Sequence, residues 1–219
     1  MAMRHVLAEL VDTYGQRTGE SLTIVSVGGV DAARRVGAGE AFDFVVLAAD
    51  AIEQLAAGGR VDPDSRVDLA RCGVAMAVAA GAPRPDLSSE AAVRRAVLHA
   101  GSIGYSTGPS GAHFKRLVER WGIADAVAPR MVQASPGIPV GTLVARGEVE
   151  LGFQQLSELI CEEGLELLGT LPPEVQAVTI FSAAVCSAST RPEAAKAALS
   201  FLAAREADAV KRRHGMEPT

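Results

Sequence analysis

The sequence is poor in aromatic residues, which make up only 4% of its 219 residues. With so few large rings, we expect a core of small aliphatic side chains and helices that lie close to their sheet. The sequence also lacks long apolar runs, and none reaches the about 20 residues that a membrane-spanning helix needs. We therefore expect no membrane insertion.

The sequence has no excess of positive charge, because its 21 Lys and Arg are outnumbered by 26 Asp and Glu and the formal net charge is −5. A nucleic-acid partner is therefore not expected, since phosphate backbones are bound by basic surfaces. The one basic run, residues 211–214, is interpreted as a helix end whose positive charges complement the helix dipole.

Cysteine is nearly absent, with only Cys72, Cys161 and Cys186 in the chain. The three are widely spaced and odd in number, so they form neither a metal-ligand pattern nor a disulfide framework. Cys72 and Cys186 lie in apolar runs, where cysteine usually behaves as a small hydrophobic residue. We expect no metal site and no cofactor.

What the sequence does contain is a regular alternation of short strands and helices. Residues 44–48 form a continuous apolar run of strand length, as expected for a strand covered on both faces. This alternation with short turns predicts an α/β protein with doubly wound parallel sheets. Strands are expected at 22–27, 44–48, 72–80, 103–105, 149–153, 165–168 and 175–187. Helices are expected at 3–14 (ended by Gly15), 31–36 (capped by Asp31), 50–57 (capped by Asp50), 88–99, 140–145, 156–162, 192–204 and 206–214. A further helix carries Phe114, Leu117, Val118 and Trp121 on one face.

Two of the predicted strands, 72–80 and 175–187, are long, and the last helices have no other strand nearby. The simplest arrangement lets both strands cross between two lobes. Residues 1–76 and 183–219 would form lobe 1, and residues 77–182 would form lobe 2. Two crossing strands make a hinge, and a hinge between α/β lobes makes a ligand cleft.

The strongest local signal is the segment 105–112, where a strand end passes into a helix through small residues. A helix N-terminus presents unpaired N–H groups and a positive dipole end, which suits an anion. Ser106, Thr107 and Ser110 add hydroxyl groups, and Gly111 allows close approach of the backbone. The segment is neither a Walker A loop nor a dinucleotide-binding turn. On local sequence alone, an anion site and a plain capping turn explain it equally well.

Three further junctions have a similar character: residues 27–31, 135–139 and 154–158. Each alone is explained by a tight turn or a helix start. In open α/β sheets, however, ligands gather outside the carboxyl ends of the strands, where all these segments are expected to lie. Two consecutive glutamines at such a strand end, Gln154 and Gln155, favour a polar cleft.

Candidates for acid–base catalysis are few. Glu158 is a possible base, although a carboxylate in the first turn of a helix is also favoured by the dipole alone. His113 lies in the first turn of a helix, where a neutral imidazole can simply pack. Tyr105 completes the set. The chain has no Ser-His-Asp order and no pair of catalytic carboxylates.

The sequence resembles the type II periplasmic binding proteins of the molybdate-binding kind over nearly its whole length. The resemblance is carried by residues 38–47 (AGEAFDFVVL), 65–74 (SRVDLARCGV), 105–111 (YSTGPSG), 143–155 (LVARGEVELGFQQ) and 215–218 (GMEP). It implies two lobes joined by two crossing strands, a small oxyanion or organic acid as ligand, and an ABC permease as a protein partner. The implied ligand contacts are Gly28, Gly29, Val30, Tyr105, Ser106, Thr107, Ser110, Gly111, Pro136, Gly137, Gln154 and Gln155.

The chain departs from the family pattern at two places. Gln155 stands where molybdate binders carry a tyrosine, which argues against molybdate itself. The family's first strand and its Ser-containing loop are also missing, since the chain starts at the first helix. As written, without a secretory signal, the chain is expected in the cytoplasm; with a truncated N-terminus, it is expected in the periplasm or outside the cell.

Some relatives of this branch resemble aconitate isomerase, which moves a double bond in a tricarboxylate by proton transfer. The resemblance thus leaves two functions open. Binding without chemistry is favoured, and isomerisation of an unsaturated di- or tricarboxylate, with Glu158, His113 or Tyr105 as the base, is the alternative.

Overall fold

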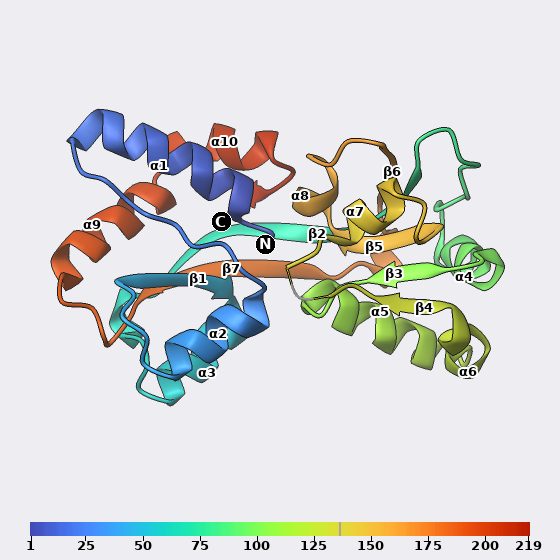
Figure 1. Cartoon of the computed structure of the whole chain (residues 1–219), viewed down its shortest axis with the longest axis horizontal. Helices are drawn as coiled ribbons and strands as arrows, with labels where there is room; N and C mark the ends of the chain where they lie inside the picture. The colour runs from blue at the N-terminus through green and yellow to red at the C-terminus, as the bar shows by residue number, and fades with distance from the viewer. Residues whose placement is uncertain (136) are drawn as a thin grey trace. The chain divides into compact units, whose positions relative to one another are not determined.

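The computed structural model describes residues 1–135 and 137–219, and the chain divides into two compact units (Figure 1). Unit 1 consists of Met1–Cys72 and Thr179–Thr219, and unit 2 of Gly73–Val178. The chain leaves unit 1 within strand β2 (Val67–Ala79) and returns at the start of β7 (Val178–Val185). The boundaries expected from the sequence, 76/77 and 182/183, fall within the same two strands.

In unit 1, strand β1 (Phe44–Ala48) pairs with β7 in an antiparallel register from Phe44↔Val185 to Ala48↔Phe181. The first half of β2 pairs with β8 (Glu217–Pro218). Helices α2 (Gly29–Gly37) and α3 (Ala49–Ala57) pack on β1. Their shared core is aliphatic and includes Val36, Leu47, Ile52 and Leu55.

The other helices of unit 1 are α1 (Arg4–Thr18), α9 (Pro192–Ala203) and α10 (Asp208–Arg213), and α1 contacts both of the others. Helix α1 does not end at Gly15 as predicted but continues to Thr18. Gly19, with φ 75°, ends it in the left-handed conformation that glycine adopts readily. Polar contacts of Glu9 with Arg213 and His214 join α1 to the C-terminal end of α10.

Residues 22–27 do not form the predicted strand: they belong to no helix or strand and have no strand partner in the described structure. The side chain of Val25 is 53% exposed. The run is rich in β-branched residues, but a β-propensity becomes a strand only where a neighbouring strand pairs with it.

The predicted aspartate caps of two helices are also wrong. The N-cap positions are Gly28 for α2 and Ala48 for α3, without a side-chain cap at either. Asp31 and Asp50 instead lie in the first turns, where a carboxylate still favours the helix through its dipole.

Unit 2 contains a mixed sheet in the order β6-β2-β5-β3-β4. Strand β3 (Ile103–Tyr105) is parallel to β4 (Met131–Gln133) and to β5 (Leu151–Gln155). The second half of β2 is antiparallel to β5 and to β6 (Leu165–Thr170). The expected parallel sheet is therefore right for β3, β4 and β5, whereas the strands on which the chain passes between the units, β2 and β7, run against their neighbours.

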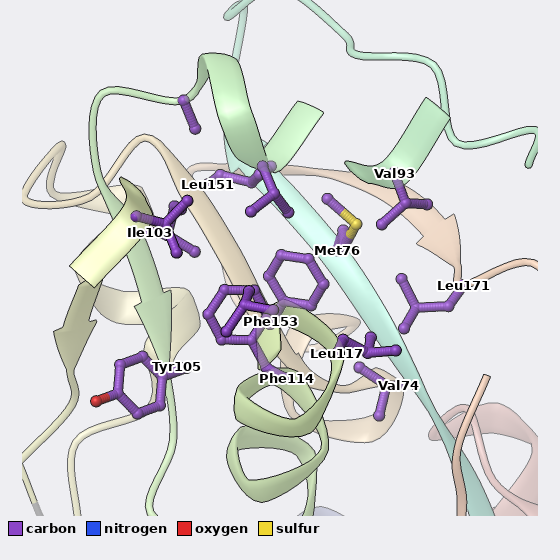
Figure 2. Close-up of a cluster of buried hydrophobic side chains, with 14 of the residues drawn as sticks. Val74, Met76, Val93, Ile103, Tyr105, Phe114, Leu117, Leu151, Phe153 and Leu171 are labelled. Carbon is purple, nitrogen blue, oxygen red and sulfur yellow. The ribbon is translucent and has the colours of Figure 1, made fainter. Parts of the chain in front are cut away.

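Helix α5 (Pro109–Arg120) covers one face of this sheet, and α7 (Val140–Ala145) and α8 (Leu156–Leu159) cover the other (Figure 1). On the α5 face, Phe114 packs against Phe153 with 4.5 Å between ring centroids (Figure 2). On the α7 face, a Cβ added to Gly152 would lie 2.6 Å from Val144 Cγ2. The helix thus lies close to the sheet because glycine leaves room for it, as the composition predicted.

The remaining elements are short, apart from α4 (Glu90–His99), whose N-cap Ser89 accepts a hydrogen bond from the Ala92 N–H. Strand β5 begins two residues later than predicted, so both glutamines belong to it. No helix in the described part of the chain is both long and apolar enough to cross a membrane. The short elements are η1 (Pro63–Ser65), α6 (Ala124–Val127), η2 (Ala128–Arg130), η3 (Pro173–Val175) and η4 (Arg205–Ala207).

Candidate functional site

The candidate site of unit 2 lies where its parallel strands end. Strands β3 and β5 pair in register, with Tyr105 opposite Phe153. The residues that follow them, Ser106 on one strand and Gln154 and Gln155 on the other, therefore reach the same edge of the sheet. This is the edge where ligands bind in open α/β sheets.

The loop after β3 is held by its own hydroxyl groups. Ser106 Oγ lies 3.0 Å from Ser110 Oγ and accepts a hydrogen bond of 3.2 Å from the Gly108 N–H. Helix α5 begins directly behind this loop, and no described side chain caps it at Gly108. The serine pair thus stands at the positive end of a 12-residue helix, where an anion is stabilised.

Gly111 fixes the shape of this loop. A Cβ at this position would lie 1.8 Å from the carbonyl oxygen of Ser106 and 2.7 Å from its carbonyl carbon. These are backbone atoms, so no rotamer change relieves the overlap. The first turn of α5 approaches Ser106 closely because residue 111 has no side chain.

The glutamines of β5 project to opposite faces of the sheet, because side chains alternate along a strand. Phe153 packs on α5, so Gln155 shares the α5 face, and Gln154 faces α7. Gln154 is 2% exposed; its Oε1 accepts a 3.1 Å hydrogen bond from the Gly141 N–H. The backbone donor orients the amide, whose Nε2 then donates to Glu158 Oε2 at 2.8 Å.

Of the three catalytic candidates, Glu158, His113 and Tyr105, Glu158 is the one whose side chain accepts a hydrogen bond from the buried amide of Gln154. Burial raises the pKa of the Glu158 carboxyl above its ordinary value, against the hydrogen bond from Gln154, which favours the charged form. A carboxyl with a raised pKa takes up a proton more readily than an ordinary carboxyl, which suits a group that accepts and returns a proton.

Ser157, between these residues, is buried with 1% exposure, and its Oγ has no hydrogen-bond partner among the described residues. A buried polar group without a partner costs about 1–3 kcal/mol. The sequence indicated the segment 154–158 but did not single out Ser157, because burial in a four-residue helix leaves no signal in a sequence.

Tyr105 and His113 have structural contacts instead. Figure 2 shows the Tyr105 ring at the edge of the core, with its hydroxyl pointing away from Phe114. That hydroxyl donates to Gln133 Oε1 at 3.3 Å. His113 Nε2 lies 2.7 Å from the carbonyl oxygen of Val175 and donates to it, since a carbonyl only accepts. Burial lowers the pKa of His113, which disfavours the charged form of the ring. The hydrogen bond to Val175 connects α5 to η3.

The other predicted contacts lie apart from this cluster or outside its unit. Thr107 is exposed in the loop between Ser106 and α5. Gly137, with φ 84°, belongs to a turn closed by a hydrogen bond from Ile138 N to Ser135 O, and Pro136 lies outside the described residues. Gly28, Gly29 and Val30 start helix α2 in unit 1, where Val30 is 65% exposed. No described group of three or more His, Cys, Asp or Glu residues is arranged to hold a metal ion.

Comparisons with known proteins cover nearly the whole chain. The model of the family described as bacterial extracellular solute-binding protein matches residues 1–217. An aconitate isomerase from a Pseudomonas species is 37% identical in an alignment of 217 residues that covers 97% of this chain and 83% of that protein.

Solved structures with low sequence identity share the fold. The periplasmic molybdate-binding protein of Azotobacter vinelandii has a TM-score of 0.82 and 20% identity, over 100% of this chain and 96% of the other. A periplasmic thiamin-binding protein has a TM-score of 0.76 and 16% identity, over 98% and 78% of the two chains.

Proposed function

Because the chain belongs to the family of bacterial extracellular solute-binding proteins and has the type II periplasmic binding protein fold, we propose that it binds a small organic acid. The ligand is held by the loop after β3 and by the polar end of β5. The observation that carries this proposal is the Ser106–Ser110 hydroxyl pair, at 3.0 Å, in front of helix α5. In this proposal an ABC permease remains the protein partner that would receive the ligand.

A carboxylate fits this loop because its oxygens accept hydrogen bonds from serine hydroxyls and its charge is favoured by the helix dipole. Two observations support an organic acid over molybdate. The 37% identical relative is an aconitate isomerase, whereas the molybdate-binding protein is 20% identical. In addition, position 155 is a glutamine, and its amide can donate to a carboxylate as well as accept from a hydroxyl.

Thermal unfolding with a panel of anions tests binding. We would measure the melting temperature with cis-aconitate, trans-aconitate, molybdate and sulfate. A ligand at 100 times its Kd stabilises the folded state by about 2.7 kcal/mol. We expect a rise with an aconitate and none for the double variant Ser106→Ala/Ser110→Ala.

Ser200→Ala is the matched control for that double variant, since Ser200 is exposed on α9 and its hydroxyl donates within its own helix, to the Lys196 carbonyl oxygen at 2.9 Å. It should respond to ligand as the wild type does. If no anion of the panel raises the melting temperature of the wild type, the proposal is wrong.

The second candidate function is isomerisation of an unsaturated tricarboxylate. It is favoured by the identity of 37% with aconitate isomerase over 97% of the chain, and by the raised pKa of Glu158. In the reaction, a base removes a proton from the methylene carbon and the C–H electrons form a new double bond. The old double bond takes up a proton at its far carbon, so the step needs no oxidant or reductant. Glu158 is the proposed base, with Gln154 positioning its carboxylate.

Incubation of the protein with cis-aconitate in D2O, followed by NMR, tests this function. We expect trans-aconitate with deuterium at carbon, no turnover by Glu158→Gln, and retained ligand stabilisation in that variant. Glu162→Gln is the control, because Glu162 accepts a hydrogen bond from Thr142 at 2.8 Å in the same region and has no role in the proposed step. A wild type that binds aconitate without converting it would leave the binding function and eliminate the isomerase.

A further inference from the structure

We propose that Ser157 is a specificity residue of the acid-binding site and that its hydroxyl donates a hydrogen bond to a second carboxylate of the ligand. This inference rests on the proposed binding function. It names the ligand class more closely, as a di- or tricarboxylate rather than a monocarboxylate.

The observation behind it is the contrast between Ser157 and the other buried serines. The described residues include four serines with less than 9% exposure. Ser65 donates to Asp62 O at 2.6 Å, Ser110 contacts Ser106 Oγ at 3.0 Å, and Ser182 donates to Asp68 Oδ1 at 2.6 Å. Of these four serines, only Ser157, the second residue of α8, has a hydroxyl with no partner in the described part of the chain.

Buried hydroxyl groups in native proteins are nearly always hydrogen-bonded, so an exception requires an explanation. Alanine at this position would fill nearly the same space without an unsatisfied polar atom. A hydrogen bond to the ligand would explain why this position is a serine, since the described protein contacts do not.

The direction of the Ser157 side chain follows from the packing of α8. Leu159 packs on Ala75 and Ala77 of β2, with Leu156 beside it. Because successive residues of a helix are rotated by about 100°, Ser157 projects to another side of α8 than these two leucines. It therefore does not belong to the apolar contact with β2.

The position of Ser157 along the chain places it at the edge of the sheet described above. Helix α8 follows β5 without a linker, and its N-cap is Gln155, the last residue of the strand. The parallel neighbour β3 ends at the same edge, where the Ser106–Ser110 pair begins. In the proposed complex, one carboxylate of the ligand bonds to the serine pair and a second carboxylate bonds to Ser157. A monocarboxylate has only one such group.

The variant Ser157→Ala tests this assignment. We expect its melting temperature without ligand to equal or exceed that of the wild type, because no protein hydrogen bond is lost. Its affinity for trans-aconitate, measured by calorimetry, should fall about tenfold or more, as for a hydrogen bond to a charged group. Its affinity for the monocarboxylate crotonate should not change.

Ser182→Ala is the matched control, since Ser182 is equally buried but donates to Asp68. It should lower the melting temperature and leave the affinity for trans-aconitate unchanged. Unchanged trans-aconitate affinity in Ser157→Ala, beside a wild type that binds, would overturn the inference and leave the binding function intact. A lower melting temperature of Ser157→Ala without ligand would also overturn it, because the hydroxyl would then have a partner within the protein. A wild type that binds neither acid would refute both proposals.

Discussion

Replacing Gly111 by alanine should both destabilise unit 2 and remove ligand binding. The added Cβ would lie 1.8 Å from Ser106 O, far inside the contact distance of two heavy atoms. Because both partners are backbone or Cβ atoms, the first turn of α5 or the loop must move. That movement separates the Ser106 and Ser110 hydroxyls, whose Oγ atoms are 3.0 Å apart.

The size of the effect follows from two opposing terms. Overpacking a well-packed region typically costs about 1–3 kcal/mol, and an overlap with backbone falls at the upper end of that range. Alanine returns about 1 kcal/mol through its higher helix propensity. The net loss of about 2 kcal/mol corresponds to a fall of about 4–8 °C in the melting temperature of a chain of this size.

Gly108→Ala is the matched control in the same loop. A Cβ at Gly108 has Ser106 Oγ as its nearest neighbour at 3.7 Å, an ordinary contact, and its φ of −87° is open to any residue. Thermal unfolding and aconitate titration of both variants provide the assay. If Gly111→Ala melts within about 1 °C of Gly108→Ala and binds equally well, the loop is not fixed by this glycine, and the reasoning fails.

Two further predictions concern charges in unit 1. Lys211 is 2% exposed, 3.6 Å from Asp208, and burial lowers its pKa below 10.5, so the folded state disfavours its charged form. Lys211→Met should therefore raise the melting temperature at pH 7, and this gain should shrink as the pH approaches 10.5. Asp208 keeps a partner in this variant, because Arg212 also pairs with it. A large loss of melting temperature at pH 7 would contradict the prediction. The hydrogen bond from His214 lowers the pKa of Glu9 below 4.5, so its stabilisation is present above pH 4.5 and lost as the pH falls through the folded-state pKa. The melting temperature of Glu9→Gln should be lower than that of the wild type at pH 7 and should fall less steeply between pH 7 and pH 3. If the melting temperatures of both proteins fall in parallel, the contact is not pH-sensitive.

Local pattern was sufficient where an element depends on its own residues. The apolar run 44–48 is a strand, and the helices at 140–145 and 192–203 have almost the bounds that their periodicity and flanking residues predict. The same pattern failed for residues 22–27, because a strand needs a partner that the segment itself cannot specify.

For the candidate site, the sequence indicated the segments but not which of their side chains are already engaged in hydrogen bonds within the protein. It marked the small residues after Tyr105 and the two glutamines of β5. It did not show that Tyr105 and His113 are engaged in structural hydrogen bonds, since their partners Gln133 and Val175 are far away in the chain.

The sequence by itself determined the α/β class, the loop of serines and glycines in front of a helix, and the family resemblance, because each depends on neighbouring residues or on motifs. Only the tertiary structure decided that the Gly111 backbone approaches Ser106, that Gln154 orients Glu158, and that the Ser157 hydroxyl is buried without a described partner. Gly111 and Gln154 meet partners only five and four residues away, but the sequence does not show which atoms of a loop or a strand end face each other once the backbone has folded. The burial of Ser157 depends on the segments packed around it, and burial is not written in local pattern either.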